Sequence, residues 1–151
     1  MEIKMDDIDI HILKILSNQA RLTVSEISSQ VNMSVPAVSE RIRKLESSGI
    51  IEKYAVILNS RILKKDLTAI MLISIERTKS VNDFLNIVQN SKDVLECHYI
   101  AGDYDYLLKI VTENTSTLEA LLNRIKGVGG VQKTKTVVVL STKKNNPSVL
   151  P

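Results

Sequence analysis

The sequence predicts an α+β protein of two modules, an N-terminal winged helix-turn-helix domain and a C-terminal ferredoxin-like βαββαβ domain. The first observation is a pair of short helical patterns joined by a turn within residues 23–49. The second is a polar segment at residues 59–66, after which strand-like and helix-like runs alternate. The third is the order of those runs, β-α-β-β-α-β, which predicts an antiparallel sheet with two helices on one face. The expected division is residues 1–58 for the first domain, 59–66 for a hinge, 67–141 for the second domain and 142–151 for a tail.

The first two helices are predicted from their capping residues and from apolar spacing. Asp6 or Asp7 can cap a helix that runs to about Ser17, and its apolar residues recur at the spacing of a core-facing stripe. Thr23 and Glu26 have the spacing of a capping box and open the second helix. Each helix therefore has an apolar side available for a shared core.

The third predicted helix combines a cap, an apolar stripe and a basic face. Ser34 can cap it, and Pro36 falls in the first turn, where a missing N–H is tolerated. Small residues near its start allow the backbone to approach base edges in the DNA major groove, while Arg41, Arg43 and Lys44 can reach phosphates or guanine. The candidate DNA-binding residues are Thr23, Ser34, Pro36, Ala37, Ser39, Glu40, Arg41, Arg43 and Lys44.

Charge leaves the role of this helix open. Residues 1–58 hold seven Lys/Arg and eight Asp/Glu, so the first domain is not basic overall, although a local basic patch is enough to neutralise phosphates. Glu40 can accept a hydrogen bond from a cytosine amino group or can simply face solvent. The alternatives are a winged helix used for protein contacts and a solvated basic face. Double-stranded DNA is the favoured partner because the caps, the turn, the apolar stripe and the basic face coincide.

Strands are predicted where β-branched and aromatic residues cluster. Residues 50–58 (IIEKYAVIL) predict a strand that forms the wing of the first domain. A capping box of Ser116 and Glu119 predicts the start of the last helix. The remaining expected elements are strands at residues 68–76, 94–101, 106–111 and 131–140 and a helix at residues 80–89.

Two predicted strands of the second domain lack the alternation of polar and apolar residues that is typical of a sheet with one solvent-exposed face. Residues 70–73 and 137–140 are consecutive apolar residues, so both faces of the sheet require burial. The helices can cover only one face, and we expect the other face to pack on a second copy of the chain. The resulting homodimer supplies the two-fold symmetry that paired recognition helices need.

The sequence GDYD, from Gly102 to Asp105, is the candidate small-molecule site. Gly102 permits an unusual backbone angle and close approach by a ligand. Asp103 and Asp105 offer carboxylates to an ammonium group, and Thr134 and Thr136 point to the same side of the last strand. The alternative is an ordinary Asp/Gly turn beside ordinary strand threonines.

Several function classes are disfavoured by composition. Aromatic residues make up 3% of the chain, with no Trp, which argues against a single-strand binder built on base stacking. No apolar run is long enough for a membrane span, and the acidic start is unlike a signal peptide. The single Cys97 predicts a reducing cytoplasm, and His11 and His98 lack metal-ligand spacing. The glycines of residues 127–130 form a turn and not a phosphate loop, so we expect no cofactor, no metal and no catalytic residues.

Four segments together resemble the Lrp/AsnC (feast/famine) family of prokaryotic transcription regulators: MDDIDIHILKILSNQAR, SVPAVSERIRKLESSGIIEKY, ECHYIAGDYDYLLK and GVGGVQKTKTVVV. The resemblance implies a winged helix-turn-helix joined by a hinge to an amino-acid-sensing domain. It also implies dimers that assemble into tetramers or octamers, a cytoplasmic, nucleoid-associated location, and an effector bound between subunits near the G-x-x-D motif. The effector-binding residues implied here are Ala101, Gly102, Asp103, Asp105, Thr134 and Thr136.

Three functions compete on this basis. The leading hypothesis is a homo-oligomeric, sequence-specific DNA-binding regulator, not an enzyme, whose assembly or DNA affinity responds to an amino acid. The second is an architectural DNA-bending protein without an effector. The third is an enzyme similar to siroheme decarboxylases, which share this organisation and hold a tetrapyrrole near a histidine; it is disfavoured because the GDYD loop is intact and the chain has only two histidines.

Overall fold

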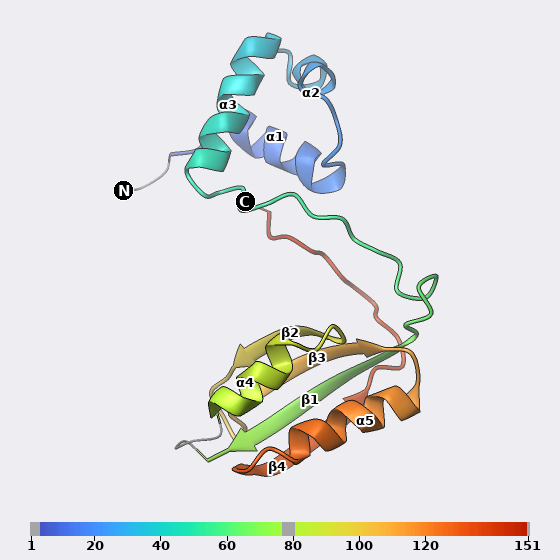
Figure 1. The fold of residues 1–151 in the computed structure, drawn as a ribbon. Helices are drawn as coiled ribbons and strands as arrows, with labels where there is room; N and C mark the ends of the chain where they lie inside the picture. The colour runs from blue at the N-terminus through green and yellow to red at the C-terminus, as the bar shows by residue number, and fades with distance from the viewer. Residues whose placement is uncertain (1–3, 77–80, 151) are drawn as a thin grey trace. The chain divides into compact units, whose positions relative to one another are not determined.

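The computed structural model describes residues 4–76 and 81–150 and divides into two compact units (Figure 1). One unit comprises Met1–Ile57 with Lys144–Pro151, and the other comprises Leu58–Lys143. The described part of the first unit is helical, whereas the second combines a four-stranded antiparallel sheet with two helices. The predicted α+β class is confirmed.

The first unit contains α1 (Asp7–Asn18), α2 (Val24–Val31) and α3 (Val35–Ser47). Asp6, of the two candidates, caps α1, because its carboxylate accepts the backbone N–H groups of Ile8 at 3.0 Å and Asp9 at 2.9 Å. Thr23 and Glu26 form the predicted capping box of α2. The apolar sides of the three helices meet in one core, built from Ile12, Ile15, Leu16, Ile27, Val38 and Leu45.

The strand predicted at residues 50–58 is not formed. Its residues favour extended backbone, but a strand also needs a partner, and all strands of the described chain belong to the second unit. The segment is tied instead to the end of α3, where the Tyr54 hydroxyl donates to Glu46 at 2.8 Å. Burial and this hydrogen bond raise the pKa of Tyr54 to about 12. Residues 147–150 of the tail line the same hollow as Tyr54 and Leu16.

The predicted hinge forms a turn at the start of the second unit. The Asn59 side chain accepts the backbone N–H groups of Arg61 at 3.1 Å and Ile62 at 3.3 Å. Lys65 then pairs with Asp93, just before the second strand of the sheet. These contacts fasten the segment to the domain that follows it.

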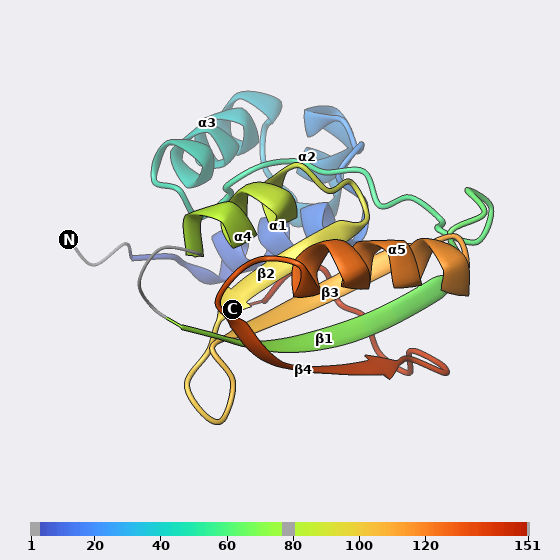
Figure 2. The same ribbon diagram turned by 60° about the horizontal axis from the view of Figure 1, so that its bottom comes forward.

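The second unit contains β1 (Leu67–Ile75), α4 (Val81–Gln89), β2 (Val94–Tyr99), β3 (Tyr106–Thr112), α5 (Thr115–Lys126) and β4 (Val131–Val138). Its strands lie in the order β2-β3-β1-β4 with antiparallel neighbours, and α4 and α5 cover one face, as predicted (Figure 2). Residue 80, where the helix α4 was expected to begin, lies outside the described residues.

The cap of α5 differs from the prediction. Asn114 has an extended backbone and accepts the N–H groups of Ser116 at 3.0 Å and Thr117 at 3.1 Å. Thr117 completes the capping box by accepting the Asn114 N–H at 3.1 Å. Ser116 therefore lies inside the helix and cannot cap it. Ser116 and Glu119 have the spacing of a capping box, but Ser116 lies two residues after the true N-cap, Asn114.

The two faces of the sheet are buried to different degrees. In β1 the residues Met71 and Ile73 are fully buried under the helices, whereas Ile70 and Leu72 are half-buried on the open face. Leu72 lies between Leu107 of β3 and Lys135 of β4 on that face. The consecutive apolar residues of β1 thus serve two faces, and only one of them is covered within the described chain.

Candidate functional site

The outer side of α3 carries most of the predicted DNA-binding side chains. Thr23 and Ser34 stand just before α2 and α3, where the Ser34 hydroxyl accepts the Ala37 N–H at 3.4 Å. These two hydroxyls therefore fix the starts of the helices. Ala37 is half-buried, and the exposed residues of the predicted surface on α3 are Pro36, Ser39, Glu40, Arg43 and Lys44.

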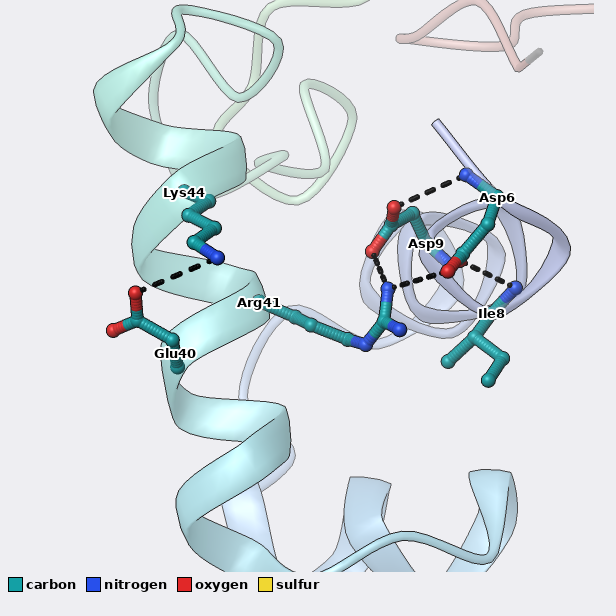
Figure 3. A network of polar contacts seen from close by, with 6 residues as sticks. All are labelled: Asp6, Ile8, Asp9, Glu40, Arg41 and Lys44. Atoms are coloured by element: carbon teal, nitrogen blue, oxygen red, sulfur yellow. Dashed lines mark hydrogen bonds and ion pairs between the residues drawn. The ribbon is translucent and has the colours of Figure 1, made fainter. Parts of the chain in front are cut away.

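Arg41 has partners that helical spacing did not predict. Its Nη1 lies 2.9 Å from an oxygen of Asp6 and 2.7 Å from an oxygen of Asp9, both at the start of α1 (Figure 3). Hydrogen bonds to Asp9 and then to Asp6 raise the pKa of Arg41, and its side chain is 26% exposed. Because the guanidinium faces α1, Arg41 joins α1 to α3 within the first unit.

A double-mutant cycle tests this link. Arg41→Ala should lower the thermal midpoint of unfolding by a few degrees, and Asp9→Asn should lower it by less, because Asp6 still pairs with Arg41. If the two residues act together, the double variant should unfold at about the midpoint of Arg41→Ala alone, measured by circular dichroism. Strictly additive shifts would contradict the link.

The stability that this link provides should depend on pH. The Asp9 N–H and Arg41 lower the pKa of the Asp6 carboxyl below its ordinary value of 3.8. The ionised Asp6 therefore contributes fully to the free energy of unfolding above pH 3.8, and this contribution is lost as the pH falls through the lowered pKa.

The remaining charged residues of this face form a separate group. The Glu40 carboxylate accepts hydrogen bonds from Arg43 Nε at 2.9 Å and Arg43 Nη2 at 2.7 Å. Lys44 Nζ lies 3.8 Å from the same carboxylate. These contacts lower the pKa of Glu40 and raise that of Arg43. The face presented to solvent is therefore a partly neutralised basic patch.

In the second unit, Asp105 closes the GDYD loop onto β1. One of its carboxylate oxygens accepts the Ile75 N–H at 2.8 Å and lies 3.3 Å from the Ser74 hydroxyl. The Asp105 N–H donates to the Ile73 carbonyl at 2.9 Å. Gly102 has a φ of 140°, which other residues rarely adopt. The loop geometry thus depends on both ends of the motif.

The structure brings part of the predicted effector set to one end of the sheet. Thr134 on β4 pairs with Ile73, the residue that also bonds to Asp105, so it lies at the loop end of β1. Thr136 pairs with Met71 and lies further from the loop. Both threonines are half-buried. The remaining members of the predicted set are exposed: Ala101, Gly102 and Asp103.

A hollow of about 310 Å³ lies beside Asp105, with Tyr99 and Tyr106 in its wall. The two rings are 5.3 Å apart between centroids. Burial raises the pKa of Tyr106, and Cys97, Tyr99 and Asp105 add to this effect. These tyrosines are not among the residues predicted to bind an effector. A usable signal existed, because three of the four tyrosines fall within residues 99–106.

In the part of the chain that the structure describes, no three His, Cys, Asp or Glu side chains lie together in a way that could bind a metal ion. His98 Nε2 lies 3.2 Å from Glu96, whose carboxylate also accepts from Lys109 at 2.8 Å. None of the helices in that part of the chain combines the length and the hydrophobicity of a membrane-spanning segment.

Comparison with known proteins decides the family. The model of the Lrp/AsnC ligand binding domain matches residues 68–149, and a winged helix-turn-helix DNA-binding model matches residues 5–52. The chain belongs to the Lrp/AsnC family. It is a transcriptional regulator with a helix-turn-helix DNA-binding domain and an Lrp/AsnC ligand-binding domain.

Relatives of this Lrp/AsnC regulator match over nearly their whole length. The HTH-type transcriptional regulator FL11 of Pyrococcus abyssi is 34% identical over 144 residues, which cover 95% of each chain. The leucine-responsive regulatory protein of Escherichia coli K12 is 33% identical over 145 residues, covering 94% of this chain and 88% of its own. The transcriptional regulator NMB0573 of Neisseria meningitidis, solved as a complex with L-Met, superposes with a TM-score of 0.91 at 30% identity, over 97% of this chain and 96% of its own.

Proposed function

We propose that this Lrp/AsnC regulator binds double-stranded DNA sequence-specifically through α3, as a homo-oligomer whose assembly or DNA affinity responds to an amino acid. The observation that supports this DNA-binding role is the composition of the outer side of α3. There the exposed cations Arg43 and Lys44 follow the small residues Pro36 and Ala37. Small residues permit close approach to the groove, and the two cations can reach phosphates or base edges. Arg41 then acts by holding α3 on α1, which separates its role from that of the other two cations.

The proposed effector site is the end of the sheet at the GDYD loop. Asp103 is an exposed carboxylate that can receive an ammonium group, and Asp105 sets the loop beside the tyrosine-lined hollow. An amino-acid ligand is favoured because NMB0573 was solved with L-Met and the E. coli relative is named as leucine-responsive. For such a ligand to act, it must bind one quaternary arrangement more tightly than another.

Light scattering on the purified protein, alone and with each of the twenty amino acids, tests the effector role. We expect one or a few of them to change the mass of the assembly. Asp105→Ala should remove this response, because the Ile75 N–H and the Ser74 hydroxyl lose their acceptor and the loop shifts. The lost hydrogen bonds should also lower the free energy of unfolding by about 1–3 kcal/mol.

Asp103→Asn provides the matched comparison, because it removes an exposed carboxylate of the same loop without touching those hydrogen bonds. It should weaken the response while leaving the unfolding free energy unchanged. A constant mass and a constant DNA affinity with all twenty amino acids would contradict the effector role. Equal affinity for random and selected duplexes would indicate an architectural protein instead of a sequence-specific one.

A further inference from the structure

One carboxylate on α3 holds both exposed cations of the proposed DNA-binding face. Glu40 grips the Arg43 guanidinium through two nitrogens, at 2.9 and 2.7 Å, and attracts Lys44 from one turn away (Figure 3 shows the Lys44 contact). A single residue can do this because positions i+3 and i+4 lie on the same side of a helix. The side chains of Glu40, Arg43 and Lys44 are 47%, 66% and 69% exposed, so a phosphate or a base can compete for each of them.

The other charges of α3 are engaged elsewhere. Arg41 is held by Asp6 and Asp9, and Glu46 accepts the hydroxyl of Tyr54. Phosphate contacts by charged side chains of this helix therefore depend on Arg43 and Lys44, the two cations that contact Glu40. Any duplex that approaches α3 must also accommodate the negative charge of Glu40.

We propose that Glu40 determines specificity by restraining Arg43 and Lys44 until a duplex offers a base amino group to its carboxylate. The inference rests on the proposed DNA-binding role of α3. On a random duplex, a phosphate must either displace Glu40 from Nε and Nη2 of Arg43 or bind the remaining N–H groups beside the carboxylate, and both weaken binding. A cytosine amino group in the major groove can donate to Glu40 and so replace Arg43 as its partner. Arg43 is then free for a neighbouring guanine or phosphate.

Glu40→Gln tests the proposal because it removes the charge and keeps the size and helix propensity of the side chain. The probes are a labelled random-sequence duplex and a duplex enriched from a random library by the wild-type protein. We expect the variant to bind the random duplex about 10-fold more tightly at about 0.1 M salt, with a salt slope steeper by about one per subunit. Its affinity for the enriched duplex should rise less or fall, so that the specificity ratio drops about 10-fold.

Two further variants separate restraint of Arg43 from a general gain of positive charge. Glu119→Gln removes the same charge from the exposed surface of α5, and it should leave both affinities unchanged. In an Arg43→Gln background, Glu40→Gln should raise the affinity for the random duplex by less than about 3-fold, because the side chain that Glu40 restrains is already absent.

Three results would overturn the inference. The first is an unchanged specificity ratio in Glu40→Gln while the wild type binds DNA. The second is an equal gain in the Arg43→Gln background, which would leave only charge repulsion. The third is an absence of binding by wild type and variant alike, which would overturn the DNA-binding role itself and the inference with it.

Discussion

Replacing Arg43 and Lys44 together by Ala should remove most of the affinity for DNA and leave the fold and the oligomeric state unchanged. Both side chains are exposed and neither is among the buried residues of the helical core, so we expect their loss to leave the packing of that core intact. Each lost phosphate contact reduces the slope of log K against log salt by about 0.9 per subunit. Charge-assisted hydrogen bonds of this kind justify an affinity loss of at least about 100-fold at 0.1 M salt. Fluorescence anisotropy over a salt series, with the random and the enriched duplex, measures both quantities.

Lys14→Ala is the matched control for this pair. Lys14 is an exposed cation of α1 with the same helical backbone, and it lies outside the predicted DNA-binding set. Its removal should change the salt slope by much less than the removal of either cation on α3. Unchanged affinity and slope in the Arg43/Lys44 variant would show that α3 is not the DNA-binding surface. An Arg41 variant cannot make this test, because its loss also disturbs the link between α1 and α3.

The elements that sequence predicted well are those set by neighbours along the chain. The capping box of Thr23 and Glu26 spans one turn, so its spacing alone marks the start of α2. The order of strands and helices in the second unit follows from the change between two periodicities, which is also local. Such local patterns give the wrong cap where two of them overlap, as at the start of α5. Asn114 and not Ser116 is the N-cap because the backbone is extended at Asn114, which the side-chain pattern does not reveal.

The features that the sequence did not reveal share a dependence on contacts distant in sequence. Residues 50–58 have strand propensity, but the described chain offers them no strand partner in their own unit. Arg41 contacts Asp9, which lies 32 positions away, so the helical spacing of α3 alone could not reveal this contact. Asp105 lies 30 positions from Ile75, and one of its carboxylate oxygens accepts a hydrogen bond from the Ile75 backbone N–H. The acidic residues at the start of α1 and the cluster of tyrosines near the loop were the available hints.

Leu72→Lys should dissociate the proposed dimer. Leu72 is half-buried on the open face of the sheet, and neither of its direct cross-strand neighbours, Leu107 and Lys135, carries a carboxylate that could pair with the new charge. If a second copy covers this face, two unpaired ammonium groups become buried in a two-fold interface. Such a penalty corresponds to a dissociation constant raised by at least about 100-fold. Light scattering over a dilution series should then report the mass of a single chain.

Ala120→Lys provides the control, because Ala120 is exposed on α5, which lies on the other face of the sheet. It adds the same charge and should leave the mass unchanged. The monomer made by Leu72→Lys retains α3, so it should still bind DNA, but with about half the salt slope of the dimer, because only one half-site is engaged. A variant that keeps its full mass would show that the open face is not the interface. The exposed apolar residues Val56, Ile57 and Leu58 would then be the next surface to test for contact between copies.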